Sequence, residues 1–450
     1  MVRAGADSTR QGARRRPGRA PEAGVALLVV MTIIVILTVL AMDFSYNAKV
    51  NLNLAANSRD EVKAFYLAKS AVNISRLVLY YQKQVDQTLQ KMKIPGFAGG
   101  IQLWKLIPIE SDFTKSFAKG QIFDTLGIPT VQPAAPGGEG APPTPAAGKP
   151  PPPKKSSAGT SSGAKEARAF ESEGSAKTEF GDFDGYFKAE IEDEESKISL
   201  RNFDNLSGWR NLAMTELMTL VLPARYNYMF ENKDADGQYT TRQELIGGIK
   251  DFIDADDKMF DLMTGTDIGP PEDMYYGKLE EPYLCKNAPL DTLAELRMVR
   301  GAGDSFFAQF GDRLTVYPVQ KMNLNSADDL MITALVCGFI KDKNHPFCTD
   351  TTGATRKTVL ERFQRFKALK ASQNMFYSPS LADIREFFTS EGIPLNDSMF
   401  GLGKMEDAIT NTSSFFTIKA LGKVGNVVRT ITCVVFTGDG KSDILYWRED

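Results

Sequence analysis

The sequence predicts an α+β fold that combines a long N-terminal helix with antiparallel strands and further helices. Residues 25–42 form an uncharged apolar run, about 27 Å long as a helix at roughly 1.5 Å per residue. Residues 415–420 and 427–437 alternate apolar and polar side chains, as the strands of a hairpin do. Residues 205–222 and 242–253 have helical spacing. A chain of 450 residues has room for two or three domains with proper cores.

The charge balance limits the classes of partner. The formal net charge is −3, but residues 1–24 carry six arginines against Asp7 and Glu22, so the remaining body has a formal charge of −7. A mildly acidic body argues against nucleic acid as the main partner. The single histidine, His345, would have to serve any Ser-His-Asp or Cys-His catalysis. We therefore assign no catalytic residue and expect no enzyme.

The N-terminal apolar run is long enough to cross a bilayer, and the arginines before it favour a cytoplasmic N-terminus. A secretory signal has a shorter apolar core with a small-residue cleavage site behind it. Here the small residues Ala23 and Gly24 precede the run. A cut after Gly24 would leave the whole helix on the mature chain, with Val25 as its first residue. The alternative is an ordinary signal-anchor.

We expect this helix to cover residues 25–94 and to end at Pro95-Gly96. Its second half has one apolar stripe at steps of four and three, formed by Leu67, Ala71, Ile74, Val78, Tyr81 and Val85. Such a stripe predicts packing on a globular head, and a coiled-coil stalk is the alternative.

The composition and periodicity of the sequence change twice in the middle of the chain. Residues 95–128 have no clear period, and ten of the 23 prolines fall between residues 129 and 153. We interpret residues 129–168 as a Pro/Gly-rich flexible linker, because this composition buries too little apolar surface to order itself. Residues 186–191 and 197–200 then alternate around an acidic turn, which predicts a hairpin or two adjacent strands.

Two acidic segments are candidate cation sites. Asn232, Asp234, Asp236 and Gly237 match the first half of an EF-hand loop, but Gln243 stands at the twelfth position, so a polar turn is the alternative. A second cluster follows, and its carboxylates are ligands for a hard cation; a solvated acidic loop is the alternative. It consists of Asp254, Asp256, Asp257, Asp261, Asp267, Glu272 and Asp273.

The four cysteines do not form a CxxC pair, so a zinc site has little support. Outside the cytoplasm, Cys285, Cys337, Cys348 and Cys433 allow two disulfides with three connectivities. We favour the local pair Cys337–Cys348. Four buried free thiols are the alternative.

Seven motifs in order resemble the general secretion pathway protein K family, the minor pseudopilins of type II secretion. One of them is the Gly24-Val25 processing site, followed by a non-acidic fifth residue, Val29. Most type IV pilin-like proteins have glutamate as the fifth mature residue, which is thought to pair with the terminal amine of a neighbouring subunit. The other six are EDEESKISL (192–200), FIDADD (252–257), PEDMYY (271–276), PYLCKNAPLDTLAELRMVRG (282–301), MNLNSADDLMITAL (322–335) and SDILYWRED (442–450). The linker and the SADD sequence at 326–329 depart from the family pattern.

The resemblance implies a pilin-like fold, in which a long N-terminal helix packs on an antiparallel sheet that is interrupted by a large helical (helix-hairpin-helix/SAM-like) insertion. Residues 1–24 would be a leader removed by prepilin peptidase. Residues 169–204 and 413–450 would supply the strands of the sheet. The insertion would have two parts, 205–318 and 319–412. Helix-hairpin-helix units often bind DNA, but Asp328 and Asp329 would repel phosphates here.

The resemblance also implies a function. The chain would be a structural subunit at the tip of the pseudopilus, needed for protein export across the outer membrane, with Val29 as the tip-defining position. Its partners would be other minor pseudopilins, prepilin peptidase and the inner membrane, which it would cross once, with most of the chain in the periplasm. Calcium would bind Asp254, Asp256, Asp257, Glu272 and Asp273. The alternative is a signal-anchored periplasmic calcium-binding hydrolase or sensor.

Overall fold

The computed structural model describes residues 22–92, 102–118, 184–204, 208–231, 233, 237, 239–374, 377–398, 404–438 and 442–450. The chain divides into two compact units, Met1–Val62 and Lys63–Asp450, and the boundary falls within the first helix. The linker expected at 129–168 lies outside the described residues.

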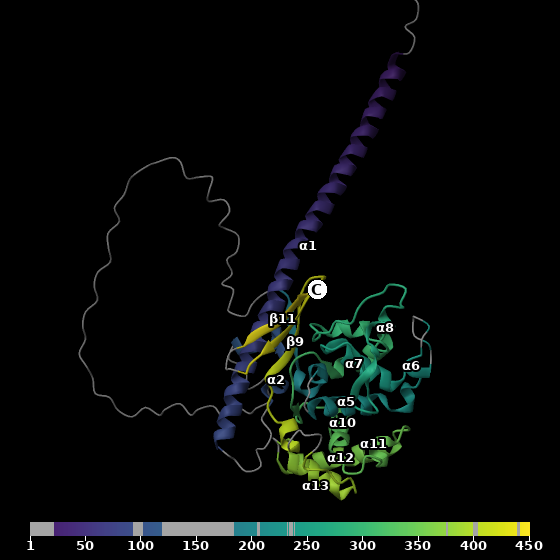
Figure 1. Ribbon diagram of the computed structural model, residues 1–450. Helices are drawn as coiled ribbons and strands as arrows, with labels where there is room; N and C mark the ends of the chain where they lie inside the picture. The colour runs from purple at the N-terminus through teal and green to yellow at the C-terminus, as the bar shows by residue number, and fades with distance from the viewer. Residues whose placement is uncertain are drawn as a thin grey trace, which may run out of the picture. The chain divides into compact units, whose positions relative to one another are not determined.

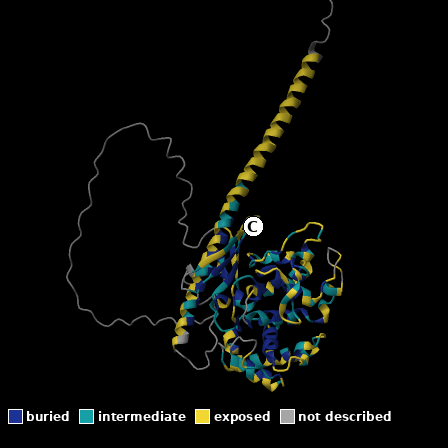
Figure 2. Ribbon diagram, viewed as in Figure 1, coloured by how far each residue is buried: buried dark blue, intermediate teal, exposed yellow. Residues whose placement is uncertain are grey.

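The long N-terminal helix is α1, Glu22–Met92, which is close to the expected range of 25–94. In the first unit, every side chain from residue 25 to residue 55 is exposed (Figure 2). The most apolar 18-residue window has a mean hydropathy of 3.1, and none of it is buried. By length and composition this part of α1 can cross a membrane, although a signal sequence near an N-terminus has the same properties.

In the second unit, one face of α1 packs on an antiparallel sheet. Ala64 and Ala68 are fully buried, and the sheet lies very close to the helix at Gly422, where a Cβ atom would be 2.0 Å from the Ala64 carbonyl oxygen. Only glycine fits at that position. The expected stripe is partly wrong, because Tyr81 is exposed and Gln82 is buried in its place.

The sheet has five strands in the order β1-β2-β9-β10-β11, and all neighbours are antiparallel (Figure 1). Its strands are β1 (Ile109–Glu110), β2 (Tyr186–Asp193), β9 (Phe415–Val424), β10 (Val427–Phe436) and β11 (Asp443–Glu449). The segment 95–128, where we found no clear period, contains β1 and the short helices α2 (Leu103–Leu106) and α3 (Ser111–Ala118). The α+β class and the antiparallel sheet are confirmed.

Two strand predictions need correction. The C-terminal hairpin forms, but β9 continues to Val424 and the turn lies at Gly425-Asn426, where Gly425 has a φ of +57°. The acidic segment at 192–195 does not close a hairpin. Instead, β3 (Ile198–Ser199) pairs in parallel with β6 (Leu314–Thr315), more than a hundred residues later in the chain.

A helical insertion separates β2 from β9. Its helices are α5 (Gly208–Val221), α6 (Tyr228–Glu231), α7 (Arg242–Ile253), α8 (Asp273–Tyr276), α9 (Asp304–Phe310), α10 (Asp329–Phe339), α11 (Pro346–Thr349), α12 (Ala354–Gln373) and α13 (Leu381–Ser390). Short 3-10 helices lie at Glu194–Ser196, Leu200–Asp204, Ala224–Tyr226, Leu293–Met298, Gly311–Arg313 and Met405–Ala408. Besides β3 and β6, its strands are β4 (Lys258–Asp261), β5 (Thr266–Pro271), β7 (Met322–Asn323) and β8 (Ile409–Thr410).

The apolar side chains of the second unit form two cores. One lies between α1 and the sheet and includes Phe187, Phe416 and Ile431. The other lies inside the insertion and joins α5 to α10, where Gly338 lets the Leu212 side chain approach closely. Because this second core contains residues from both 205–318 and 319–412, the two expected parts of the insertion share one hydrophobic interior.

Candidate functional site

The acidic candidate site lies at the C-terminal end of α7. The N-cap of the helix is Thr241, whose side chain forms a capping box with Glu244. Asp251 and Asp254 are three residues apart and so lie on the same face at its end. The β4–β5 hairpin then folds back, and the Phe260 backbone N–H donates to Asp251 Oδ1 at 2.9 Å. Glu272 follows β5 directly, which brings it to the same place.

A buried lysine stands among three of these carboxylates. The side chain of Lys250 is only 2% exposed, and its Nζ contacts Asp254 Oδ2 and lies 2.6 Å from Asp267 Oδ1 and 3.8 Å from Asp256 Oδ2. Burial lowers the pKa of Lys250, but the hydrogen bonds and charges of Asp254 and Asp267 outweigh it and raise the pKa. The ammonium therefore stays charged.

A second group of carboxylates shares Asp254 with the first but has no lysine of its own. Oxygens of Asp251, Asp254 and Glu272 lie within 4.8 Å of one another, and all three residues are buried. Glu272 is 3% exposed, and among the described residues neither of its carboxylate oxygens has a hydrogen-bond partner. Asp254 Oδ1 is also unpartnered. Asp251 and Glu272 line a cavity of about 130 Å³, together with Tyr275, Tyr276 and Arg300.

These environments raise the pKa values of the three carboxylates. Burial, and then the negative charges of Asp251, Asp254 and Asp256, raise the pKa of Glu272 to about 9. Burial is also the main reason that the pKa of Asp251 rises to about 7 and that of Asp254 to about 6. At neutral pH and without a further cation, Glu272 is therefore protonated.

The structure brings together some of the residues that we named as ligands and separates others. Asp254, Asp256 and Glu272 lie in the two groups, and so does Asp267, which we named only as part of the acidic segment. Asp257 and Asp273 belong to neither, since Asp257 is exposed and Asp273 Oδ1 accepts the Cys285 backbone N–H at 2.7 Å.

Asp251 and Lys250 were missed. The signal for Asp251 was its position three residues before Asp254 on a helix. The EF-hand-like residues Asn232, Asp234 and Asp236 lie outside the described residues.

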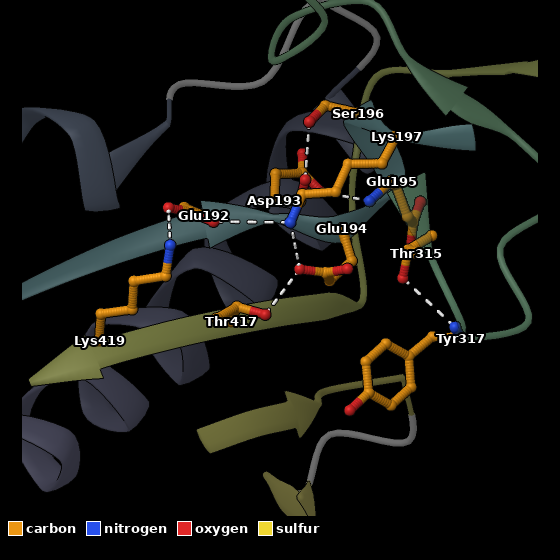
Figure 3. A network of polar contacts seen from close by, with 10 residues as sticks. All are labelled: Glu192, Asp193, Glu194, Glu195, Ser196, Lys197, Thr315, Tyr317, Thr417 and Lys419. Carbon is orange, nitrogen blue, oxygen red and sulfur yellow. Dashed lines mark hydrogen bonds and ion pairs between the residues drawn. The ribbon is translucent and has the colours of Figure 1, made fainter. Parts of the chain in front are cut away.

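A different buried acidic network lies where the chain leaves the sheet and enters the insertion (Figure 3). Asp193 Oδ2 accepts hydrogen bonds from Ser413 Oγ at 2.6 Å and from Asn323 Nδ2 at 2.9 Å, and Oδ1 accepts the Glu195 backbone N–H. Burial raises the pKa of Asp193, while these hydrogen bonds lower it in part. The network joins the end of β2 to β7 and to the segment before β9.

The neighbouring side chains of this network are paired as well. Glu194 Oε1 accepts from Lys197 Nζ and from Thr417 Oγ1, both at 2.6 Å. Burial lowers the pKa of Lys197, but the charges of Glu194 and Glu192 outweigh it and raise the pKa. Glu195 Oε1 accepts the Ser414 backbone N–H, although burial still raises the pKa of Glu195 to about 7. We refer to Asp193, Glu194 and Glu195 with these partners as the junction network.

The cysteines form one disulfide. Cys337 and Cys348 are bonded, which is the local pair that the sequence favoured, and the bond ties the end of α10 to α11. A second bond between Cys285 and Cys433 is not formed, and both are buried free thiols. They lie in different cores, Cys285 in the insertion and Cys433 in the sheet, so they do not meet.

The N-terminal candidates all lie on α1, and Val25 and Val29 belong to its exposed part. Gly24 is inside the helix, and the side chains of Val25 and Val29 are 65% and 51% exposed. His345 has a structural role, because its Nδ1 accepts the Phe347 backbone N–H at the start of α11.

Comparisons with known proteins found similarity to solved structures. No protein-family model matches the chain, and no curated protein matches it. Among solved structures, the chain is similar to a chain of the GspK-GspI-GspJ complex from the type 2 secretion system of enterotoxigenic Escherichia coli, with 14% identity and a TM-score of 0.37. The match covers 60% of this chain and 85% of that chain.

Proposed function

We propose that this protein is a non-enzymatic minor pseudopilin of a type II secretion pseudopilus. The observation that supports this role is that α1 has two different halves. The first offers an apolar, exposed surface long enough to cross a bilayer, and the second packs on an antiparallel sheet. A helix with these properties serves first as a single-pass anchor in the inner membrane and then as a filament contact, with the rest of the chain in the periplasm. The seven ordered motifs support the same assignment.

Processing at the N-terminus tests this assignment. When the chain is expressed with a prepilin peptidase, the mature protein should begin at Val25, as read by N-terminal sequencing. A Gly24→Leu variant should keep the leader, because the small residue before the cut is lost, whereas Val25→Ile should be processed normally. A chain that starts at Met1, or one cut after Met42, would contradict the proposal.

Val29 supports a position at the tip. A carboxylate within an apolar helix costs about 2.5–3.5 kcal/mol when it has no partner. A subunit at the tip has no further subunit above it to supply one, so an apolar residue is favourable there. Val29→Glu should therefore reduce export across the outer membrane in the native host, while Val29→Leu should leave it unchanged. Full export with Val29→Glu would argue for a position inside the filament.

We further propose that the insertion binds calcium at Asp251, Asp254 and Glu272. Two oxygens that bind one Ca²⁺ at about 2.4 Å are at most about 4.8 Å apart, and these three carboxylates satisfy that limit. The unpartnered oxygens of Glu272 and Asp254 fit a hard cation, which prefers oxygen ligands. Bound calcium would supply the positive charge that this buried group lacks. Asp257 and Asp273 are not part of this proposal.

A further inference from the structure

Two groups of carboxylates share Asp254 but differ in the partners of their oxygen atoms. The group formed by Asp254, Asp256 and Asp267 surrounds the Lys250 ammonium. The group formed by Asp251, Asp254 and Glu272 leaves both oxygens of Glu272 without a partner among the described residues. The first group therefore holds a cation that the chain itself supplies, and the second group holds none of its own.

The lysine is fixed in its place from several sides. It lies on α7 next to Asp251 in the sequence, and its Nζ is 5.0 Å from the centre of the Phe260 ring, which comes from β4. Asp254 is at the end of the same helix, and Asp267 is on β5. An ammonium is a compact point charge on a flexible stem, so it can occupy a position among carboxylates that a metal ion would otherwise fill.

The charges favour binding of a divalent ion in addition to the lysine. Asp251, Asp254, Asp256, Asp267 and Glu272 with Lys250 have a formal charge of −4 when all are ionised. Burying such a charge is costly unless it is paired. Glu272 is the strongest sign of a further ligand, because it is 97% buried and lies against the cavity with no partner of its own.

We propose that Lys250 is a built-in cation that occupies the Asp254–Asp256–Asp267 group and restricts divalent-cation binding to Asp251, Asp254 and Glu272. The proposal rests on the calcium binding proposed above and adds a stoichiometry to it. The wild-type chain binds one ion in this region. A chain without the Lys250 ammonium gains a second position, in which Asp254 bridges the two ions.

The test is the number of calcium ions bound by the full-length chain in detergent, measured by equilibrium dialysis with radioactive calcium. Lys250→Gln should bind one ion more than the wild type. Lys250→Arg keeps the positive charge and should bind as many ions as the wild type. Lys286→Gln is the matched control, because Lys286 also pairs with two carboxylates, Asp291 and Glu295, but outside the cluster. It should not change the number.

Equal binding by the wild type and a folded Lys250→Gln variant would overturn the inference. If the wild type binds no ion and Lys250→Gln binds one, the role of Lys250 stands and the proposed calcium site fails, so the two failures are distinguishable. If circular dichroism shows that Lys250→Gln is unfolded, the Asp267→Asn variant is used to test the inference in its place. That variant should retain the wild-type ion, and its loss, or no binding by the wild type, would overturn the inference.

Discussion

The junction network and the carboxylates of Asp251, Asp254 and Glu272, which we call the α7 cluster, are both buried and acidic, but their carboxylates have different partners. Asp193 is 5% exposed and Glu272 is 3% exposed. Asp193 accepts hydrogen bonds from Ser413, Asn323 and the Glu195 backbone, whereas Glu272 has no partner among the described residues. Burying a carboxylate is unfavourable unless it is paired. The same degree of burial is therefore compensated at Asp193 and uncompensated at Glu272. The Asp193 carboxylate is satisfied by hydrogen bonds within the fold, whereas the Glu272 carboxylate needs a proton or a cation from outside.

Breaking the junction network should have the largest effect. Asp193→Ala removes the acceptor of two side-chain donors and one backbone donor. Leaving such buried donors unpaired should lower the free energy of unfolding by about 3 kcal/mol. Denaturant unfolding of the full chain, with and without calcium, measures this, and the loss should be the same in both. Glu190→Ala, on the exposed side of the same strand, is the control and should change nothing measurable.

The α7 cluster should respond to calcium instead. At a free calcium concentration of 100 times the Kd, binding to the folded state alone adds about 2.7 kcal/mol. Thermal unfolding should therefore shift upward on addition of calcium and return with a chelator. Glu272→Gln should abolish the shift, because it removes the charge of the unpartnered carboxylate. A shift that survives in Glu272→Gln but disappears in Asp193→Ala would reverse the comparison.

Without calcium, the pH dependence of the free energy of unfolding should show that Glu272 lacks a partner. The folded-state pKa of Glu272 is about 9, above an unfolded value of about 4.3. The folded state therefore binds more protons between these values, and the stability that Glu272 contributes is complete below pH 4.3 and lost as the pH rises through 9. Asp251 and Glu195 act in the same direction, up to about pH 7.

We expect the Tm of the calcium-free chain to fall by about a few °C between pH 7 and 9. The Glu272→Gln variant should have a flatter profile in that range, and saturating calcium should flatten the wild-type profile too. An equally steep fall in the variant would show that Glu272 is not the group that titrates.

The smallest effect should come from the edge of the junction network. Glu192 pairs with Lys419 at 2.6 Å, but both side chains are more than a third exposed, so solvent screens the pair. Glu192→Gln should cost about 0.5 kcal/mol or less. A larger loss in denaturant unfolding would mean that the network depends on Glu192 as it does on Asp193.

The features that could be predicted from the sequence have local patterns. Eighteen uncharged and mostly apolar residues in succession predict the start of α1, and alternation predicts β9 and β10. The failures involve partners far away in the chain. Gln82 is buried in place of Tyr81 because its Oε1 accepts the Leu103 backbone N–H at 2.6 Å, and β3 pairs with β6 rather than with β2. No window of sequence contains both members of such a pair.

The same reason explains why the acidic site was predicted only in part. The loop residues Asp254, Asp256 and Glu272 stand out as a cluster in the sequence. Lys250 and Asp251 lie inside an amphipathic helix, where neighbouring charged residues ordinarily mark the solvent face. The β4–β5 hairpin covers them, and the contact between Asp251 and Phe260 that fixes this arrangement is tertiary.

The register of the sheet allows the whole insertion to be regarded as the loop of one β-hairpin. Asp193 at the end of β2 lies opposite Phe416 in β9, and its carboxylate accepts a hydrogen bond from Ser413. A turn of a few residues could close the same two strands. Since the entropy of closing a loop rises by only about 0.6 kcal/mol per doubling of its length, segments of very different size are compatible with the same sheet. Residues can therefore be inserted or deleted between β2 and β9, which changes the helical insertion while the face of the sheet that packs on α1 is unchanged.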